Sequence, residues 1–472
     1  MAGFRISYEV PYLSETRRFS LLIIVLIGTL LGPLDSAVNI AFPDITSSFG
    51  LELKAIRWVV IAYVATYASL MLVFGRVGDL IGHNRVFTAG LVVCILGFGI
   101  CSIATSYNWL LVSRVLQGIG TALVLSCGPA LATSLYSERW RPRVLGAYAM
   151  MFGLGGALGP SLGGWLVEHW GWQAVFWFRL PIVLIALLLS LMLRMPVPER
   201  DQGNFDLGGA LLLAMTTALL LATISQLDRM NENVTLVTLF FAFTASAVVI
   251  FIVRSVRSSN PIIDLGAFSE FSFTWMNIAT LVVNLAGFAT MLSVPYFLVR
   301  VTDLTLSESG LIMAVGPVGM MIASQSAGHA LPHIGAQRLA IMAGFLVASG
   351  LLWMSHWEAS IESIVLCAAL LLHGIGLGLF QVAALDFIAS TLPKSQRGVA
   401  GSLALVMRTI GVVIAASVLT IVFAHLQTAF APGDADGFVS AFQQVFWYAS
   451  IGLAGFLAAS LFRTGLWLGR SS

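Results

Sequence analysis

The sequence predicts an all-α membrane protein that crosses the bilayer many times. Three observations predict this fold: the composition, the number of long apolar segments and the placement of positive charge. Apolar residues make up 58% of the 472-residue chain and charged residues only 10%, whereas soluble domains contain roughly 25% charged residues. The surface is therefore expected to face lipid. The net charge of +2, with no basic run, gives no indication of a nucleic-acid partner.

Fourteen segments are long and apolar enough to span a hydrocarbon core about 30 Å thick, which takes about 20 helical residues. The first is too long for a signal peptide and lacks a small-residue cleavage site, so we interpret it as a retained helix. The predicted spans lie near residues 19–42, 58–75, 86–106, 109–135, 144–167, 172–194, 207–227, 234–253, 271–299, 305–328, 337–355, 361–390, 399–424 and 438–462.

The distribution of lysine and arginine tests this number, because short cytoplasmic loops hold most positive charge. With the N-terminus inside, seventeen of the 24 Lys/Arg fall on the inner side, four fall outside, and Arg114, Arg179 and Arg408 lie within spans. A missed helix would scramble this bias. We therefore expect a multi-pass protein of the plasma (inner) membrane, monomeric, with both termini in the cytoplasm and the lipid bilayer as its surroundings.

An internal repeat divides the chain into two halves. Gly75, Gly82 and Arg85, after the second span, match Gly328, Gly335 and Arg338, after the tenth, at an offset of 253 residues. The same offset relates the start of the first span to that of the ninth. We therefore expect a six-helix bundle over 1–194, a linker with two extra spans over 195–270 and a second six-helix bundle over 271–472. Such repeats give transporters alternating access around a midplane site.

The repeated segment of the first half reads Gly75-Arg-Val-Gly-Asp-Leu-Ile-Gly-His-Asn-Arg-Val86. It resembles the cytoplasmic signature between the second and third helices of the major facilitator superfamily. The resemblance implies a gating motif of Gly75, Gly78, Asp79, Gly82 and Arg85. Asp79 is expected to latch the halves by facing the start of the thirteenth span near Gly398, where free N–H groups and the helix dipole favour an anion. A solvated loop acid is the alternative.

Two residues of this segment depart from the family pattern. His83 and Asn84 stand where arginine or lysine is common in the superfamily. This departure predicts a weaker or pH-sensitive latch.

The fifth span contains a regular set of glycines. Gly155, Gly159 and Gly163 recur every four residues, so they form one smooth stripe against which another helix can pack closely. A proline inside the helix removes one backbone hydrogen bond and can bend it. The whole spacing matches the antiporter motif of drug:H+ antiporter branches, and this resemblance implies export. The motif comprises Gly146, Gly155, Gly159, Pro160, Gly163 and Gly164.

The first span contains an acid, in Gly32-Pro-Leu-Asp-Ser-Ala-Val-Asn-Ile-Ala-Phe-Pro43. This segment resembles the first-helix motif of the fourteen-helix drug:H+ antiporter branch. Asp35 lies about 12 Å from the outer end of its span and Arg114 about 8 Å from that of the fourth span. We hypothesise that Asp35 takes up and releases the driving proton and that Arg114 weakens its hold on the proton when the two approach. A static structural ion pair is the alternative.

Further polar residues fall at depths compatible with a central cavity. Structural uses remain open: buried cation for Arg408, core histidine for His373 and helix–helix hydrogen bonding for Asn277 and Asn284. Asp386 is either a second proton site or an interfacial acid beside Lys394 and Arg397. Arg179 is expected to extend toward the outer surface. The cavity candidates are Asn39, Gln117, Asn277, Asn284, His373, Gln381, Asp386 and Arg408.

The motifs of common enzyme classes are missing from the sequence. It contains no phosphate-binding P-loop, no zinc-ligand spacing and no serine in a nucleophile elbow. We therefore expect no enzyme activity, no metal and no cofactor other than the proton gradient.

These observations together predict a proton-coupled antiporter that exports amphipathic or cationic small molecules by alternating access. Its partners would be the substrate and protons. The first alternative is a dedicated exporter of one metabolite or lipid on the same fold. A non-transporting membrane sensor is the second, although no sizeable soluble domain supports it, and a membrane enzyme is the last.

Overall fold

The computed structural model describes residues 14–51, 55–192, 205–227, 233–258, 261–302, 304, 306–430 and 435–462. Within these ranges, fourteen segments are long and apolar enough to cross a membrane, which confirms the predicted number. The α-helices are α1 (Glu15–Leu30), α2 (Ala37–Ile40), α3 (Phe42–Phe49), α4 (Arg57–Ile81), α5 (His83–Ser102), α6 (Tyr107–Ser134), α7 (Arg141–Trp170), α8 (Ala174–Trp177), α9 (Arg179–Met192), α10 (Leu207–Ser225), α11 (Val234–Arg257), α12 (Phe271–Val301), α13 (Leu306–Ile334), α14 (Ala336–Met354), α15 (Ser363–Thr391), α16 (Arg397–Phe430) and α17 (Ala435–Leu461).

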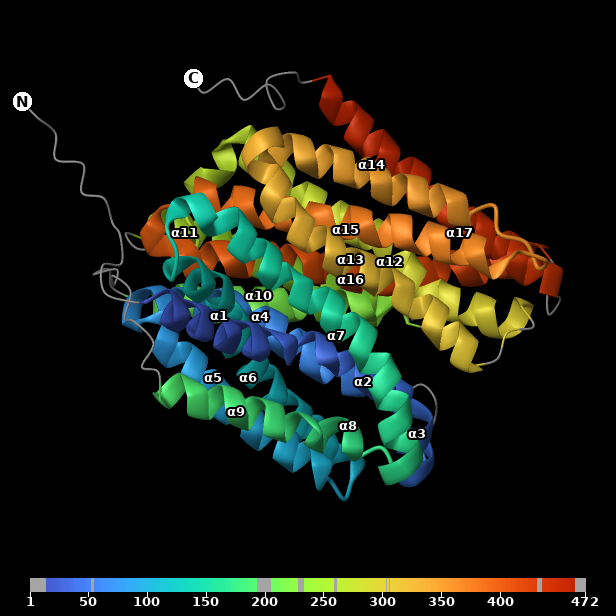
Figure 1. Ribbon diagram of the computed structural model, residues 1–472, viewed down its shortest axis with the longest axis horizontal. Helices are drawn as coiled ribbons and strands as arrows, with labels where there is room; N and C mark the ends of the chain where they lie inside the picture. The colour runs from blue at the N-terminus through green and yellow to red at the C-terminus, as the bar shows by residue number, and fades with distance from the viewer. Residues whose placement is uncertain are drawn as a thin grey trace, which may run out of the picture.

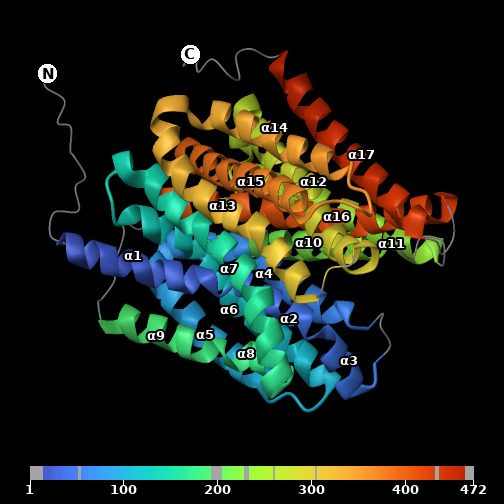
Figure 2. The same ribbon diagram turned by 45° about the vertical axis from the view of Figure 1, so that its right-hand side comes forward.

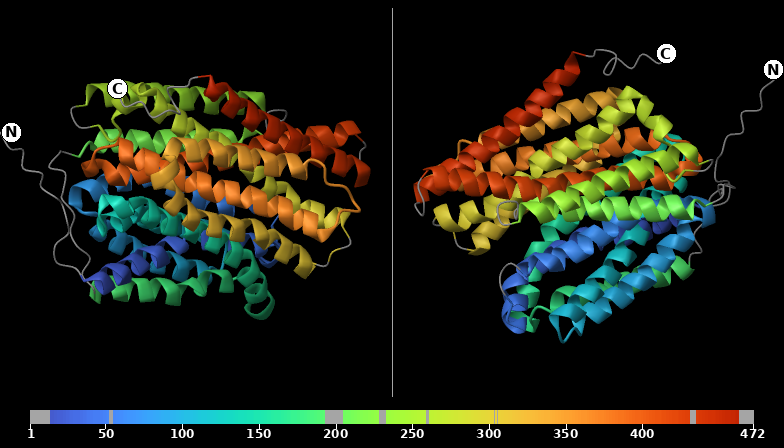
Figure 3. Two further views of the ribbon diagram at one scale, coloured as in Figure 1. Left: turned by 45° about the horizontal axis from the view of Figure 1, so that its top comes forward. Right: turned by 180° about the vertical axis from the view of Figure 1, so that it is seen from behind.

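The helices form two bundles that lie side by side. Helices α1 to α9 make up the first bundle and α12 to α17 the second (Figures 1 and 2). Helices α10 and α11 pack on each other, and α10 contacts both α4 of the first bundle and α16 of the second. The further views show the same division (Figure 3). The exact bundle boundaries of the sequence analysis stay a prediction.

The first span, Glu15–Ile40, is broken in its second half. Helix α1 ends at Leu30, and residues Pro33–Ser36 form a 3-10 turn, η1, before the short helix α2. Proline has no N–H to continue the α-helical ladder, and a preceding glycine tolerates the change of geometry. Asp35 lies within η1. The sixth span is also divided, into α8 and α9.

The gating segment is helical up to Ile81, which corrects the expected loop over 75–86. Helix α4 continues from the membrane through Asp79, and only Gly82 separates it from α5. Gly82 has φ +106° and its repeat partner Gly335 has φ +85°, a conformation that side chains with a Cβ rarely adopt. Both glycines join consecutive long helices by a single residue, so the sequence repeat corresponds to a repeat of backbone geometry.

Candidate transport site

Asp35 is bound by a ring of donors in the first bundle. Arg114 of α6 donates from Nη1 to Oδ1 and from Nη2 to Oδ2, each at 2.7 Å. Gln117, one turn further along α6, donates from Nε2 to Oδ1 at 2.8 Å. The similar depths expected for Asp35 and Arg114 agree with this bidentate ion pair. The carboxylate keeps 12% of its side-chain surface exposed, whereas Arg114 is fully buried.

Arg179 completes this ring, which corrects the expectation that its side chain extends to the outer surface. Its Nη1 donates to Asp35 Oδ1 at 2.9 Å, and its Nε and Nη2 donate to the carbonyl of Val175. Val175 belongs to α8 and Arg179 begins α9, so the break in the sixth span leaves a carbonyl that the guanidinium satisfies. We call Asp35, Arg114, Gln117 and Arg179 the Asp35 cluster; its formal charge is +1.

Two tyrosines connect this cluster to the second bundle. The guanidinium of Arg114 lies 4.3 Å from the ring centre of Tyr63, and Tyr63 contacts Tyr67, one turn away on α4, at 5.1 Å between ring centres. The Tyr67 hydroxyl lies 3.4 Å from Thr409 Oγ1 on α16.

Arg408 lies where the two bundles meet. Its guanidinium lies 4.4 Å from the ring centre of Phe152 on α7. Its side chain is partly exposed, and among the described residues no carboxylate forms an ion pair with it. An arginine within a span costs several kcal/mol unless it is paired or hydrated, so an arginine in this position is expected to have a partner in some state of the protein.

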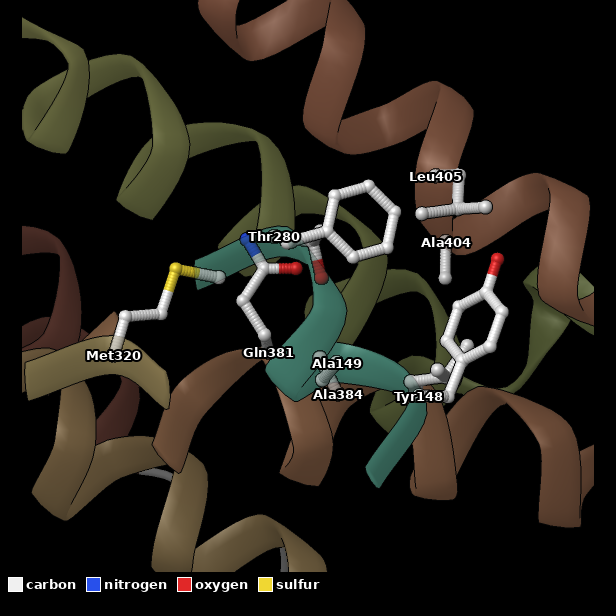
Figure 4. Close-up of a pocket in the computed structure, with 10 residues that line it drawn as sticks. Tyr148, Ala149, Thr280, Met320, Gln381, Ala384, Ala404 and Leu405 are labelled. Carbon is white, nitrogen blue, oxygen red and sulfur yellow. The ribbon is translucent and has the colours of Figure 1, made fainter. Parts of the chain in front are cut away.

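A small cavity lies between the bundles beside Arg408. It is about 10 Å³ in volume, enough for roughly one water molecule. Figure 4 shows Tyr148, Met320 and Gln381 around it. The lining residues come from α7 of the first bundle and from α12, α13, α15 and α16 of the second: Tyr148, Ala149, Phe152, Thr280, Met320, Gln381, Ala384, Leu385, Ala404 and Leu405.

The gating segment contacts the second bundle directly. Asp79 Oδ1 accepts from the backbone N–H of Gly398 at 2.9 Å, and Oδ2 accepts from that of Val399 at 3.3 Å. These groups belong to the first turn of α16, where N–H groups have no helical partner. His83 Nε2 lies 3.1 Å from Asp79 Oδ1. We call Asp79, His83, Gly398 and Val399 the latch, and the surrounding end of the molecule the latch end.

The glycines of the gating segment permit this contact. A Cβ on Gly75 would lie 2.5 Å from Ser402 Oγ and 2.6 Å from the Gly398 carbonyl oxygen. A Cβ on Gly78 would lie 2.5 Å from His83 Nδ1. Arg85, in contrast, is exposed.

A second set of charges joins the bundles at the same end. Arg141, at the start of α7, donates from Nε to Asp386 Oδ1 of α15 at 2.9 Å and from Nη1 to Glu138 Oε2 at 2.8 Å. Glu138 also accepts from Arg397, the first residue of α16, and lies 3.6 Å from Lys394 Nζ. Asp386 is therefore an interfacial acid, although its partner is Arg141 and not the neighbours expected from the sequence.

The glycines of α7 divide between two opposite faces. A Cβ on Gly155 would lie 2.7 Å from Pro33 Cγ, and one on Gly163 would lie 3.0 Å from Ala37 Cα. This stripe, together with Gly159, therefore packs on η1 and α2, the segment that contains Asp35. Helix α7 runs through Pro160 without a break.

The other face of α7 meets the second bundle. A Cβ on Gly146 would lie 2.6 Å from the Ser324 carbonyl oxygen of α13, and one on Gly153 would lie 2.8 Å from Met321 N. Gly164 is less restricted, because its nearest contact would be Ile40 at 3.9 Å. Helix α7 thus lies between Asp35's segment and the second bundle.

Several cavity candidates lie elsewhere. Asn284 does not line the cavity but is bonded to two residues that do: it donates to the Thr280 carbonyl at 2.7 Å, and its Oδ1 accepts from Gln381 Nε2 at 2.9 Å. Asn277 is buried and donates to its own helix, and His373 is buried beside Thr290. Both are core residues of the second bundle, which corrects their expected place in the cavity.

Asn39 is exposed near the end of α2. Among the described residues, no group of three or more His, Cys, Asp or Glu could hold a metal ion.

Two helical bundles joined around a polar centre, with an ionisable cluster buried at membrane depth, are the architecture of a secondary transporter. The chain belongs to the Major Facilitator Superfamily, whose family model matches residues 24–416. It is an integral membrane transporter of this superfamily.

Known relatives cover most of the chain. It is 28% identical to the riboflavin transporter RibZ of Clostridioides difficile (strain 630), over 87% of this chain and 90% of that one. It is 31% identical to the multidrug resistance protein Stp of Mycobacterium tuberculosis (strain CDC 1551 / Oshkosh), over 82% and 72%. The human organic anion transporter MFSD10 shares the fold, with a TM-score of 0.68 at 15% identity over 92% and 99%. The family match and the similarity to the multidrug resistance protein Stp fit the drug:H+ antiporter branch.

Proposed function

We propose that the protein is a proton-coupled antiporter that exports amphipathic small molecules by alternating access. It would act in the plasma (inner) membrane as a monomer, with both termini and the latch end in the cytoplasm. The proton gradient would be its energy source. The observation that supports this proposal best is the position of Asp35, an acid at membrane depth, inside a broken helix and paired with arginines.

Asp35 is the proposed proton site. An acid in a span costs several kcal/mol unless it is paired, hydrated or protonated. In this conformation it is paired with two guanidinium groups, which stabilise the carboxylate. Separation from these groups would favour protonation. A cycle that alternates between the two conditions would take up a proton and release it.

Movement of the bundles as rigid bodies would not separate Asp35 from its partners, because all of them lie in the first bundle. The 3-10 turn η1 must therefore shift relative to α6 and α9. Helix α7 is the element that can cause this shift, because Gly155 faces η1 and Gly153 faces α13 of the second bundle. A displacement of α13 against α7 would therefore be transmitted to Asp35 through a single intervening helix, α7.

The test is transport by the full chain in proteoliposomes with an imposed pH gradient and a panel of amphipathic compounds. Wild type is expected to concentrate at least one compound against its gradient, and Asp35→Asn is expected to lose this accumulation. The variant should keep exchange down a gradient, because the binding cavity is unchanged. An Asp35→Asn protein that still builds a proton-driven gradient would contradict the coupling role.

A dedicated metabolite exporter is the second candidate, and the similarity to RibZ over 87% of this chain favours it. The same panel, with riboflavin included, separates the two. Accumulation of one metabolite and no synthetic amphiphile would favour the dedicated exporter, whereas accumulation of several unrelated compounds would favour the broad pump.

A further inference from the structure

We propose that the central site selects amphipathic organic anions with an aromatic body, and that Arg408 binds their charged group. This inference rests on the proposed transport function and names its substrate class. It differs from the expectation of cationic substrates, because an arginine without an ion pair among the described residues lies where the bundles meet, and the Asp35 cluster in the first bundle also has a net positive charge.

The ionisable groups around the centre of the molecule establish this excess. The Asp35 cluster contains two arginines and one carboxylate. Arg408 adds a third guanidinium, and within the described ranges it has no ion pair. Asp386, near the end of its span, is paired with Arg141 at the latch end. A cation that entered the centre would meet net positive charge, whereas an anion would reduce it.

Arg408 lies at the contact between the two bundles, against a residue that lines the cavity. It belongs to α16 of the second bundle and its guanidinium stacks on Phe152 of α7 in the first. The Tyr148 ring, which lies beside Phe152 at 5.9 Å between ring centres, also lines the cavity. The contact with the ring uses none of the conventional hydrogen-bond acceptors, so the guanidinium N–H groups can donate to a carboxylate or sulfonate.

The apolar lining of the cavity suits the aromatic body of such an anion. Phe152, Met320 and Leu405 supply aromatic, thioether and aliphatic surface around the cavity. Gln381 Nε2 is already bonded to Asn284, but its carbonyl can still accept a hydrogen bond. In this conformation the cavity volume is about 10 Å³, so an aromatic ligand requires the bundles to separate. Arg408 and Phe152 would part in that movement, because they belong to different bundles.

The test uses three ligands with the same aromatic body and different fixed charge: naphthalene-2-sulfonate, naphthalene-2-sulfonamide and 2-naphthyltrimethylammonium. Affinity of the purified full chain in detergent is measured by isothermal titration calorimetry. The sulfonate is expected to bind at least about tenfold more tightly than the ammonium compound, because one charge-assisted contact accounts for that factor. Equal or tighter binding of the ammonium compound would overturn the proposal.

Variants of Arg408 assign the preference to this residue. Arg408→Gln is expected to weaken sulfonate binding about tenfold and to leave sulfonamide binding unchanged. Arg408→Lys keeps the charge and should keep most of the preference. Arg254→Gln, on the added helix α11, is the matched control and should change neither. If Arg408→Gln does not fold, the lysine variant and the wild-type ligand series still decide the outcome. A folded glutamine variant with unchanged selectivity would overturn the role of Arg408.

Counterflow of labelled naphthalene-2-sulfonate in proteoliposomes tests the anion site separately from the proposed proton coupling. Counterflow with no response to a pH gradient would contradict proton coupling and support the anion site. Proton-driven accumulation of the ammonium compound without sulfonate counterflow would support antiport and overturn the anion site.

Discussion

Asp35 accepts hydrogen bonds from four side-chain donor groups, and two of its three partner residues are arginines. Each arginine also donates to a backbone carbonyl, Arg114 to that of Val59 and Arg179 to that of Val175. These bonds orient both guanidinium groups independently of their contact with the Asp35 carboxylate. The cluster is therefore preorganised, and loss of either arginine would leave a carbonyl as well as part of the carboxylate unsatisfied.

We expect Arg179→Gln to lower the free energy of unfolding by about 1–3 kcal/mol, the range for a charged hydrogen bond. In a double-mutant cycle with Asp35→Asn, the coupling should reach about 1 kcal/mol, as for residues in one ion-pair network. Denaturant unfolding in detergent micelles measures both.

The pair of Arg254 and Asp206 is the matched control for this cycle. The Arg254 side chain is 45% exposed, and exposed pairs contribute about 0–1 kcal/mol. Its coupling should therefore be the smaller. Additive effects of Arg179→Gln and Asp35→Asn would contradict a direct interaction of these two residues.

At the residue scale, the sequence predicted positions along helices well and contacts less well. The depths of Asp35 and Arg114 follow from counting residues from the ends of their spans, and their ion pair agrees with that. The direction of a side chain around its helix depends on which helices are neighbours, and sequence does not contain this for Arg179. A usable signal was present, because one deep acid among three deep arginines predicts shared partners.

At the element scale, α7 is the helix with glycines on two opposite faces. Gly155 and Gly163 let the broken first span approach, and Gly146 and Gly153 let α13 approach. A helix packed in this way can slide on both neighbours, because few side chains interlock. The motif that resembles an antiporter signature is thus a pair of close-packing surfaces, with Asp35's segment on one side.

Gly155→Ala is expected to disturb this packing. The added methyl would lie 2.7 Å from Pro33 Cγ and 3.1 Å from the Leu34 nitrogen, and neither ring nor backbone can rotate away. Overpacking of this kind costs about 1–3 kcal/mol, so we expect lower thermal stability in detergent and slower transport.

Gly164→Ala is the matched control in the same helix, since its methyl would meet only Ile40 at 3.9 Å. It should leave transport unchanged and the melting temperature equal or slightly higher, because alanine favours helix more than glycine does. Equal effects of the two substitutions would contradict the assigned faces of α7.

The latch allows a second prediction at this scale. Asp79→Asn removes the charge that faces the first turn of α16, where a helix dipole and two N–H groups favour an anion. We expect the closed conformation of the latch end to lose about 1–2 kcal/mol, which corresponds to about fivefold to thirtyfold more of the open form. Maleimide labelling of Ser402→Cys, a position on α16 that is fully buried against Gly75 of α4, measures it.

Cys94 is the internal control for this labelling. It is also fully buried, but it packs on α6 inside the first bundle, beside Gly120. Opening between the bundles should expose the cysteine at position 402 and leave Cys94 protected, whereas unfolding would expose both. Unchanged labelling at position 402 in Asp79→Asn would mean that Asp79 does not hold this end closed.

The predicted ends of the spans came from hydropathy alone, and this explains why some features of the helices were predicted and others were missed. Long apolar runs gave all fourteen spans. The break at Gly32–Pro33 was hidden because the residues on both sides remain apolar, so the run continues while the backbone hydrogen bonding changes. The helical extension over Gly75–Ile81 was missed for the opposite reason. A polar helix end has the same backbone hydrogen bonds as an apolar one. Hydropathy does not detect it, because its side chains are not apolar.

At the scale of the whole molecule, the bonds between the bundles are concentrated at the latch end. They include the contacts of Asp79 with α16, of Arg141 with Asp386 and of Glu138 with Arg397. The offset of 253 residues predicted two repeated halves, and Gly82 and Gly335 have the matching backbone geometry. The interface itself could not be predicted, because the repeat relates residues within the halves and not residues across them.

Alternating access predicts opposite movements at the two ends of the molecule. Paired spin labels on cysteines can measure them: Arg85→Cys with Arg338→Cys at the latch end, and Ser48→Cys with Ser360→Cys at the other end. All four positions are exposed, and each pair joins one bundle to the other. When Asp79→Asn weakens the latch, the Arg85–Arg338 distance should increase and the Ser48–Ser360 distance should decrease, because rigid bundles that rock about a central site cannot open at both ends. The same variant with both pairs moving apart would indicate loosening of the fold. A latch-end distance that increases alone would indicate a local gate and would contradict rocking of the two bundles.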